Sequence, residues 1–322
     1  MTESAVLYVR AVNRVPSWLE PRISAYSKDD PTRNIKPIPC HSHNDYKQPV
    51  PLFDALHTGC TGVEADVWLF DGELYVGHTV DSLTPNRTLH SLYIDPLLKL
   101  LDARNNHGNS SSWTGLYSQD PTQTVVLLID IKSDGFDTFP HVSRQLSDLR
   151  SRGYLTHFNG THTIPGPITV IGSGSTPFDL VVADPHNRDI FFDAPAWISP
   201  SFNSPPYFPA SPRRRQSQAH STPGPTGKYE SDMFDNTTSW YASADLSWYR
   251  RKFHWGEDAL DGLVKTIGSR GLKLRFYGVP KNVWRMLIDA GVAMVSVDDL
   301  EAAAREDWRP RRLVGLGRRD RG

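Results

Sequence analysis

Cysteine is scarce in this sequence, with only Cys40 and Cys60 among 322 residues. Two cysteines are too few for a disulfide scaffold or a thiolate zinc cluster, so both classes of protein are excluded. We expect Cys40 at the end of one strand and Cys60 near the start of the next. Opposite ends of neighbouring strands lie too far apart for the short Cα separation that a disulfide needs. The sequence therefore predicts two free, buried thiols.

Long apolar runs and net charge are missing as well. No segment reaches the roughly 20 apolar residues of a transmembrane helix, and residues 1–30 lack the apolar stretch of a signal peptide. The formal net charge is −1, so no overall field attracts nucleic acid or anionic lipid. These absences predict a soluble protein with no transmembrane segment and no nucleic-acid partner. An anionic substrate must then be bound by local charges.

What is present suits a packed globular domain, with 38% hydrophobic and 11% aromatic residues to fill its core. Four Asn-X-Ser/Thr sequons begin at Asn86, Asn109, Asn159 and Asn236. Such sequons are glycosylation acceptors in secreted proteins. The localisation therefore stays unknown, with a secretory compartment, the extracellular space and peripheral membrane contact all left open.

Eight short runs of apolar or β-branched residues indicate strands that are buried on both faces of a parallel sheet. They lie at 35–40, 62–69, 125–131, 168–172, 189–192, 240–244, 272–277 and 293–297. Helical patterns lie between several of them, at 51–58, 259–267 and 283–290. Alternation of strands and helices predicts an α/β fold, and eight repeats predict a closed (β/α)8 TIM barrel. A doubly wound open sheet is the structural alternative.

The barrel domain is predicted over residues 35–302, between an N-terminal extension (1–34) and a basic flexible tail (303–322). A short extra strand at 73–78 follows the second barrel strand through an Asp-Gly turn, which predicts a small hairpin. Residues 199–232 are rich in Pro, Ser and Arg and are predicted to be a disordered insertion. A lid or a basic docking loop is an alternative role for this insertion.

Charged residues recur at the carboxyl ends of the predicted strands, where barrel enzymes place their chemistry. Glu64 and Asp66 share one face of the second strand, as Asp130 and Lys132 do on the third. Three carboxylates from neighbouring strands form an all-oxygen site for one hard divalent cation, with Mg²⁺ favoured over Ca²⁺. Lys132 would place a compact positive charge beside a phosphate bound there. A purely structural network of Lys132 with these acids is the alternative.

Two histidines flank this carboxylate cluster in the predicted arrangement. His41 is expected to close the first strand and His78 the extra hairpin. Phosphodiester cleavage needs a base for the attacking hydroxyl and an acid for the leaving oxygen, and histidine serves both because it titrates near neutrality. Contacts to the phosphate or headgroup are predicted at four further positions, namely His43, Asn44, Arg275 and Tyr277.

The motifs that carry these residues resemble, as an ordered set, the phospholipase C-like phosphodiesterase superfamily. They read His-Ser-His-Asn-Asp at 41–45, Gly-Val-Glu-Ala-Asp-Val at 62–67, Val-Gly-His at 76–78 and Val-Leu-Leu-Ile-Asp-Ile-Lys at 126–132. Glycerophosphodiester phosphodiesterases and spider-type sphingomyelinase D are similar at these points. The residues of these motifs are most similar to those of the altered inheritance of mitochondria protein 6 family, and the resemblance covers about residues 36–302. The resemblance implies a metal held by Glu64, Asp66 and Asp130, with His41 and His78 as the acid–base pair.

Motifs and chemistry together predict an enzyme, a metal-dependent phosphoric diester hydrolase or cyclising lyase. The expected substrate is a small-molecule or lipid phosphodiester of the glycerophosphodiester or phospholipid type. One departure from glycerophosphodiesterases is the shorter Asp130, where they usually carry Glu. Their substrate-reading loops also have no clear counterpart here, so substrate identity does not transfer.

Two other functions stay open. An amidohydrolase-like metalloenzyme would use His41 and His43 as a His-x-His pair together with Asp298. Such enzymes need further histidines after the fifth and sixth strands, where this sequence has Asp193 and Ser243. A non-catalytic barrel that binds phosphoinositides or phosphate is the other alternative, with the arginine run at 213–215 available for docking.

Overall fold

The computed structural model describes residues 31–105, 113–196, 233–252 and 257–311. Eight parallel strands of this part of the chain form a closed barrel, which confirms the predicted (β/α)8 fold. In spatial order they are β1 (Ile38–Ser42), β2 (Cys60–Phe70), β4 (Val125–Ile131), β7 (Ile168–Gly174), β8 (Ile190–Pro195), β9 (Ser239–Asp245), β10 (Lys273–Tyr277) and β11 (Met294–Val297). Pairing of β1 with both β2 and β11 closes the barrel.

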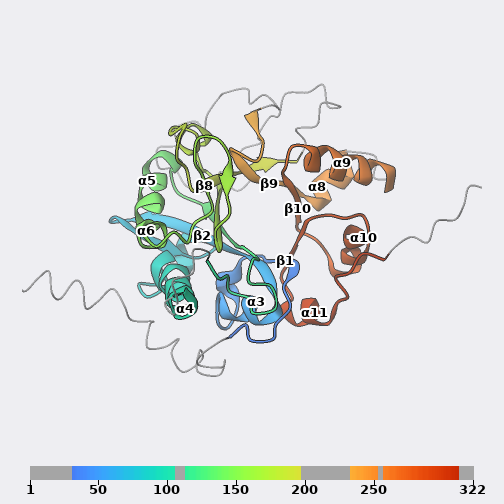
Figure 1. Ribbon diagram of the computed structural model, residues 1–322, viewed down its shortest axis with the longest axis horizontal. Helices are drawn as coiled ribbons and strands as arrows, with labels where there is room; N and C mark the ends of the chain where they lie inside the picture. Colours follow the sequence, from blue (N-terminus) through green and yellow to red (C-terminus); the bar gives the residue numbers. More distant parts are fainter. Residues whose placement is uncertain (1–30, 106–112, 197–232, 253–256, 312–322) are drawn as a thin grey trace, which may run out of the picture.

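Helices surround the barrel on its outer side (Figure 1). They are α3 (Phe53–Thr58), α4 (Asp95–Asn105), α5 (Gly135–Gln145), α6 (Ser147–Ser151), α7 (Phe178–Val181), α8 (Leu246–Lys252), α9 (Glu257–Ser269), α10 (Trp284–Asp289) and α11 (Leu300–Arg305). Short helical turns are η1 (Asp45–Lys47), η2 (Val80–Ser82), η6 (Lys281–Val283) and the π-helical η3 (His90–Ile94), and a small hairpin joins β5 (His157–Phe158) to β6 (Thr163–Ile164). None of the described helices is long and apolar enough to cross a membrane.

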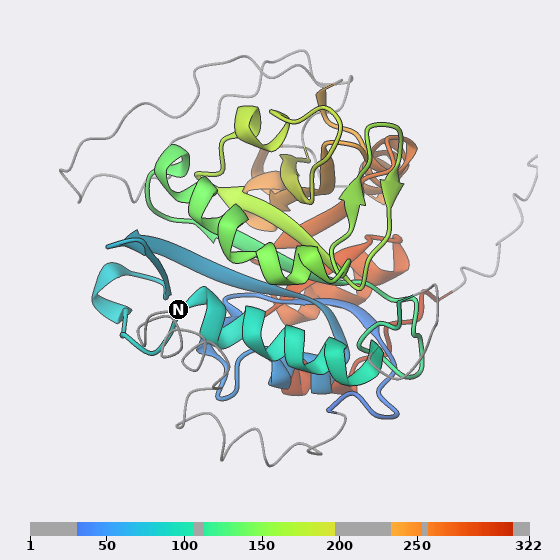
Figure 2. The same ribbon diagram turned by 60° about the vertical axis from the view of Figure 1, so that its left-hand side comes forward.

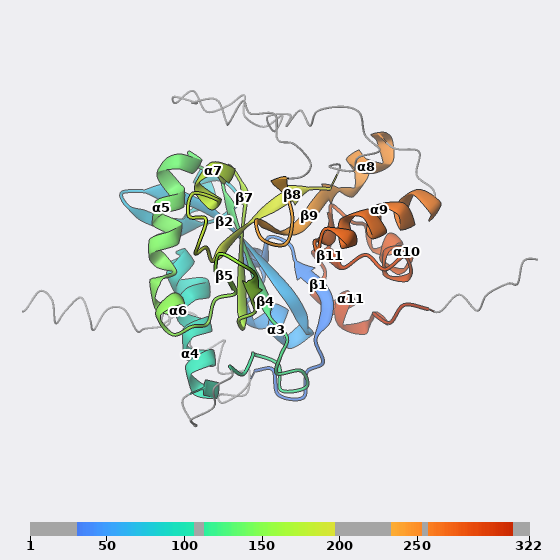
Figure 3. The same cartoon turned by 45° about the horizontal axis from the view of Figure 1, so that its top comes forward.

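The predicted extra hairpin is present. Strand β3 (Glu73–Val76) pairs antiparallel with the end of β2, from Val67 opposite Val76 to Phe70 opposite Glu73. Its turn consists of Asp71 and Gly72, both with positive φ (49° and 81°), the conformation that an Asp-Gly pair favours in a tight hairpin. The hairpin extends β2 beyond the barrel beside α5, as Figures 1 and 3 show.

Successive side chains of each strand point alternately into the barrel and out toward the helices, so the molecule has two apolar cores. Side chains such as Val63, Ala65 and Val67 of β2 pack outward against the helices. A second cluster fills the interior of the barrel, with Val126, Leu128, Ile171, Tyr241 and Met294 buried together. Glu64 and Asp66 have the inward parity, so they stand above this interior cluster rather than in the outer core.

The prediction of two free thiols was wrong, because Cys40 and Cys60 form a disulfide with a Cα separation of 4.7 Å. The error came from the position of β1, which was expected at 35–40. Pro37 has no N–H to donate, and the strand begins at Ile38 and continues to Ser42. The register also shifts, with Ile38 opposite Cys60 but His41 opposite Gly62. Both cysteines therefore lie at the same end of the β1–β2 pair.

Several predicted segments fall outside the described residues. They include the insertion at 199–232, most of the N-terminal extension and most of the basic tail. Within the described part, α11 crosses residue 302 and Trp308 is buried, its ring 6.1 Å from that of Trp284. The packed part of the chain therefore extends a few residues past 302.

Candidate active site

The register of β2 and β4 brings the three predicted metal-ligating carboxylates together. Asp66 pairs directly with Asp130, and Glu64 lies one inward position below Asp66. One ligand oxygen from each residue lies within 4.8 Å of the other two. Among the described residues, these three carboxylates form a group that could hold a metal ion. Glu64 and Asp66 are both buried.

The donor set fits a hard divalent cation. One oxygen of Asp66 and one of Asp130 (Oδ1 in each) are buried without a hydrogen-bond partner, and buried carboxylate oxygens without partners are costly. Burial raises the pKa of Asp66 to about 7, with the charge of Asp130 as the next cause. Burial also raises the pKa of Asp130, against the opposing charge of Lys132, and the charge of Glu64 adds to the rise. A cation would relieve both the repulsion and the missing contacts.

Lys132 already supplies part of that compensation. Its Nζ lies 2.6 Å from Asp130 Oδ2 and 3.3 Å from Asp66 Oδ2. Burial alone lowers the pKa of Lys132, but Asp130 and Asp66 outweigh burial and raise it above its ordinary value. The ion-pair network considered as an alternative for Lys132 is thus present. It also positions an ammonium group at the edge of the carboxylate cluster.

His41 does not close its strand, and it lies beneath the carboxylates rather than at their rim. It is fully buried, opposite Gly62, and its ring contacts Tyr241 edge-on at 5.9 Å. Neither ring nitrogen has a hydrogen-bond partner. Burial lowers the pKa of His41 well below its ordinary value, and the charge of Arg275 lowers it further. The ring is close enough to Gly62 that a Cβ there would lie 2.2 Å from Nδ1.

His43 occupies the rim position that was predicted for His41. Its backbone N–H donates to Val297 O, which continues the β1–β11 pairing by one residue. Its Nε2 lies 3.7 Å from Glu64 Oε2, and its Nδ1 lies 2.7 Å from Asp298 Oδ1. Burial lowers the pKa of His43, but the hydrogen bond to Asp298 and the charge of Glu64 raise it overall.

His78 lies on the other side of the cluster, where the chain leaves the hairpin. Its Nδ1 is 3.4 Å from Asp66 Oδ2, and its side chain is 37% exposed. The Tyr46 hydroxyl donates to Asp66 Oδ2 over 2.7 Å and lies 3.3 Å from His78 Nδ1. Sequence reasoning did not single out Tyr46, although it follows Asn44 and Asp45 in the motif that carried the resemblance. The feature of the sequence that could have identified Tyr46 is its position two residues after Asn44 in this motif.

Two of the residues predicted to contact phosphate, Asn44 and Arg275, contact Glu64. The backbone N–H of Asn44 donates to Glu64 Oε2 over 3.1 Å, from a left-handed conformation with φ 49°. Arg275 is buried across the barrel from it, with Nη2 3.8 Å from Glu64 Oε2. Tyr277 is half-buried, and its ring centroid lies 5.5 Å from the Arg275 guanidinium carbon. Burial raises the pKa of Tyr277 to about 12.

Asp193 and Ser243 complete this side of the site and were not predicted as functional. Arg275 Nη1 lies 3.4 Å from Asp193 Oδ2, and Ser243 donates to Asp193 Oδ1 over 2.5 Å. Arg275 Nε donates to Ser296 Oγ over 3.0 Å. Burial raises the pKa of Asp193 to about 6, against the opposing effect of Arg275. A polar network of four strands thus supports Glu64 from behind.

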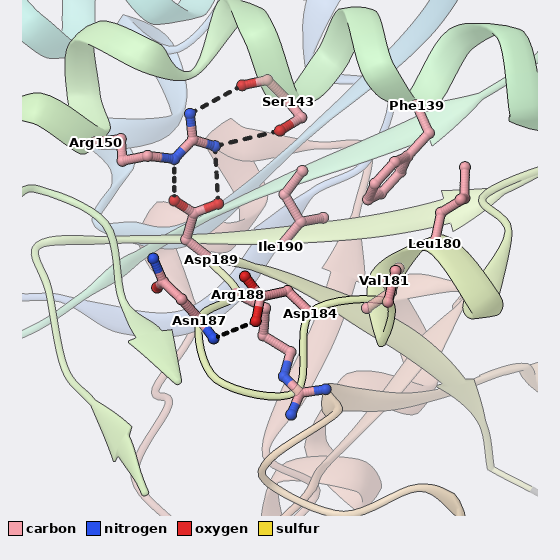
Figure 4. Close-up of a pocket in the computed structure, with 11 residues that line it drawn as sticks. Phe139, Ser143, Arg150, Leu180, Val181, Asp184, Asn187, Arg188, Asp189 and Ile190 are labelled. Carbon is pink, nitrogen blue, oxygen red and sulfur yellow. Dashed lines mark hydrogen bonds and ion pairs between the residues drawn. The ribbon is translucent and has the colours of Figure 1, made fainter. Parts of the chain in front are cut away.

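A separate cavity of about 280 Å³ lies outside the barrel, between α5, α7 and the start of β8 (Figure 4). Its most prominent charges are already paired, because Arg150 makes two hydrogen bonds to the Asp189 carboxylate. None of the predicted site residues lines it. The predicted site therefore lies at the barrel mouth and not in this cavity.

Clustered carboxylates, a lysine and two histidines thus meet at the carboxyl-end face of a closed (β/α)8 barrel, the face on which barrel enzymes carry their active sites. The sequence matches the family described as "AIM6-like phosphodiesterase domain" over residues 29–193. The chain belongs to the altered inheritance of mitochondria protein 6 family.

Its relatives support this assignment over most of the chain. A protein named "Altered inheritance of mitochondria protein 6 homolog" from Arthroderma benhamiae is 35% identical over 291 residues, which is 85% of each chain. "Altered inheritance of mitochondria protein 6" from Lachancea thermotolerans is 33% identical, over 93% of this chain and 73% of the relative. Among solved structures, a glycerophosphodiester phosphodiesterase from Thermotoga maritima aligns with a TM-score of 0.41 and 12% identity, over 83% of this chain and 97% of the other.

Proposed function

We propose that this protein is a metal-dependent phosphoric diester hydrolase. One observation carries the proposal: three carboxylates gather within 4.8 Å of one another, with a histidine on either side of them. Glu64, Asp66 and Asp130 would hold one divalent cation, with Mg²⁺ proposed over Ca²⁺. When bound, such a cation polarises a phosphoryl oxygen and offsets the negative charge that develops there.

We propose His43, in place of His41, as the partner of His78 in acid–base catalysis. A general base or acid must reach the reacting oxygen, and the His43 ring stands at the rim beside Glu64 whereas the His41 ring is enclosed. Asp298 binds His43 Nδ1, which fixes the tautomer and leaves Nε2 directed toward the carboxylates. Lys132 would meet a non-bridging phosphate oxygen with its ammonium group.

His43 and His78 approach the cluster from different strands, β1 and the segment after β3. One would take the proton of the attacking hydroxyl while the other gives a proton to the leaving oxygen. If the attacking hydroxyl belongs to water the enzyme is a hydrolase, and if it belongs to the substrate the product is a cyclic phosphate. Phosphorus NMR of the product distinguishes the two, because a cyclic phosphate and an open monoester resonate separately.

The first experiment measures p-nitrophenol release from bis(p-nitrophenyl) phosphate with EDTA and after addition of Mg²⁺ or Ca²⁺. We expect EDTA to abolish release and a hard cation to restore it. His43→Ala and His78→Ala should each lower kcat by roughly 10²–10⁴-fold, whereas His186→Ala, at an exposed histidine before β8, should not.

Retention of full activity by His43→Ala together with its loss in a folded His41→Ala would return the acid–base role to His41. Absence of both turnover and Mg²⁺ or Ca²⁺ binding by calorimetry would contradict the enzyme and favour a non-catalytic phosphate-binding barrel. Activity that needs a tightly bound transition metal would instead favour an amidohydrolase-like enzyme.

A further inference from the structure

Large apolar side chains are exposed at four positions among the described residues. They are Phe70, Val80, Phe136 and Met233, with 42%, 49%, 48% and 40% of their surface accessible. Three of the four follow residues of the candidate active site closely in sequence. Phe70 follows Asp66 by four residues, Val80 follows His78 by two, and Phe136 follows Lys132 by four. Scattered exposed apolar residues are ordinary, but a group of them on segments that are joined to one another indicates an interaction surface.

The segments that carry these three side chains are tied to one another. The backbone N–H of Leu69 donates to Ser133 Oγ over 3.1 Å, which joins the end of β2 to the loop before α5. His141 of α5 has its Nδ1 3.1 Å from Gly72 O in the hairpin turn. Trp68 Nε1 donates to Gly77 O over 2.9 Å, which holds the segment after β3 against β2. Figures 2 and 3 show the β2–β3 hairpin and the first turn of α5 on the same side of the barrel.

The first turn of α5 holds Phe136 in its exposed position. Asp134 accepts hydrogen bonds from the backbone N–H groups of Phe136 and Asp137, an N-cap that fixes the start of the helix. The buried face of α5 is formed instead by Gly135, Thr138 and Val142. Phe136 therefore faces away from the core because of the helix register, not because the turn is irregular.

Charge distinguishes this surface from a basic membrane anchor. Each of the three apolar residues is followed directly by an exposed aspartate, namely Asp71, Asp81 and Asp137. Anionic lipid surfaces attract basic segments and repel acidic ones. The outermost groups of a zwitterionic phospholipid layer are ammonium groups, which complement these carboxylates, while the apolar side chains enter below them.

We propose that Phe70, Val80 and Phe136 form an apolar rim that docks this protein on a zwitterionic phospholipid surface. Docking would set the barrel mouth, with Lys132 and the carboxylates, at the level of the lipid phosphodiester. The inference rests on the proposed function only for this catalytic consequence. Docking itself depends on the rim alone.

Co-sedimentation of the full chain with phosphatidylcholine vesicles tests the proposal. We expect wild-type protein to bind, and binding to weaken when a third of the lipid is replaced by phosphatidylserine. The triple variant Phe70→Ser/Val80→Ser/Phe136→Ser should bind about tenfold or more weakly, because each large apolar side chain contributes through its burial. Met233→Ser is the matched control, since Met233 is similarly exposed but lies in the segment before β9, and it should bind as the wild type does.

Failure of the wild type to bind phosphatidylcholine vesicles, or equal binding by the triple variant, would overturn the proposal. Binding that strengthens with phosphatidylserine would overturn its zwitterionic part. Hydrolysis of bis(p-nitrophenyl) phosphate and thermal unfolding should be unchanged in the triple variant, which shows that the fold is intact. If that compound is not cleaved but the triple variant still loses vesicle binding, the proposed function fails and the docking surface stands.

Discussion

His41 and His43 are separated by one residue, yet their rings have opposite surroundings. The ring of His41 lies over Gly62 and Tyr241 with no polar partner for either nitrogen. That of His43 lies one inward position higher, between the carboxylates of Glu64 and Asp298. A neutral, enclosed imidazole supports packing, whereas an imidazole with an acidic partner and an open side can exchange protons.

Asp298 is therefore predicted to set the pH range in which His43 works. Because Asp298 contributes to raising the pKa of His43, Asp298→Asn should lower that pKa. If His43 acts as the base, activity rises as the pH passes its pKa, so the acid limb of kcat/KM should move to lower pH in the variant. The measurement is a pH profile at fixed metal concentration.

Asp299→Asn, which removes the neighbouring exposed acid that caps α11, is the control for this prediction and should leave the acid limb of the pH profile in place. An unmoved limb in Asp298→Asn would exclude this role.

Tyr46 is predicted to support both the metal site and His78. Its hydroxyl donates to Asp66 Oδ2 and is within 3.3 Å of His78 Nδ1. Residues that orient metal ligands typically change affinity by about 10–100-fold when they are removed. Tyr46→Phe should weaken Mg²⁺ binding, measured by calorimetry, by at least the lower of these factors. Tyr75→Phe on β3 is the matched control, and equal affinities in the two variants would contradict the prediction.

At the scale of elements, the eight strands were predictable because each is a short apolar run whose burial in a parallel sheet depends on composition alone. The register of β1 was not predictable in the same way, because it depends on where Pro37 ends the preceding loop and on a shift against β2. Because the predicted bounds of β1 were displaced from the observed ones, His41 was expected at the rim of the barrel and Cys40 was expected too far from Cys60 for a disulfide. Glu64, Asp66 and Asp130 were expected together because they share a face at the ends of neighbouring strands, and the unshifted pairing of β2 with β4 brings them together.

The Cys40–Cys60 disulfide links the two strands that carry His43, Glu64 and Asp66. It closes a segment of 20 residues that includes η1 and α3. Restricting the unfolded chain over such a segment contributes about 3 kcal/mol of stability.

Reduction of the disulfide should therefore lower the thermal midpoint of the wild type, measured by circular dichroism with and without a phosphine reductant. Cys40→Ser/Cys60→Ser should unfold at the reduced midpoint and no longer respond. An identical midpoint for the oxidised and reduced wild type would show that the bond contributes no stability.

At the scale of the whole molecule, the disulfide bears on where the chain works. Disulfides persist in oxidising compartments, and the three sequon asparagines among the described residues, Asn86, Asn159 and Asn236, are all exposed. The fourth, Asn109, lies outside them. We propose a secretory or extracellular location on these two independent grounds. Removal of N-glycans from the protein purified from its own cells should reduce its apparent mass, and an unchanged mass would count against the proposal.

The barrel as a whole should be stabilised by the cation that its mouth is proposed to bind. Asp66 and Asp130 come from different strands and meet only in the folded chain, so a metal held by both favours the native state. At a concentration 100 times Kd the gain is about 2.7 kcal/mol, and Mg²⁺ should raise the thermal midpoint.

The pKa of Asp66, raised to about 7 in the folded protein, gives this gain a pH dependence. Between the unfolded and the folded pKa, the unfolded chain has already released the proton that Asp66 still binds in the folded protein beside Asp130. The stability of the metal-free protein therefore falls as the pH rises toward the folded pKa. The metal competes with the proton for the same oxygens, so the rise in midpoint should be larger at about pH 8 than at about pH 6. Glu64→Gln should reduce the rise, and Asp179→Asn, at an exposed acid of α7, should not. A rise that is the same in Glu64→Gln as in the wild type would place the cation elsewhere on the molecule, since Glu64 contributes one of the three oxygens that define the proposed site.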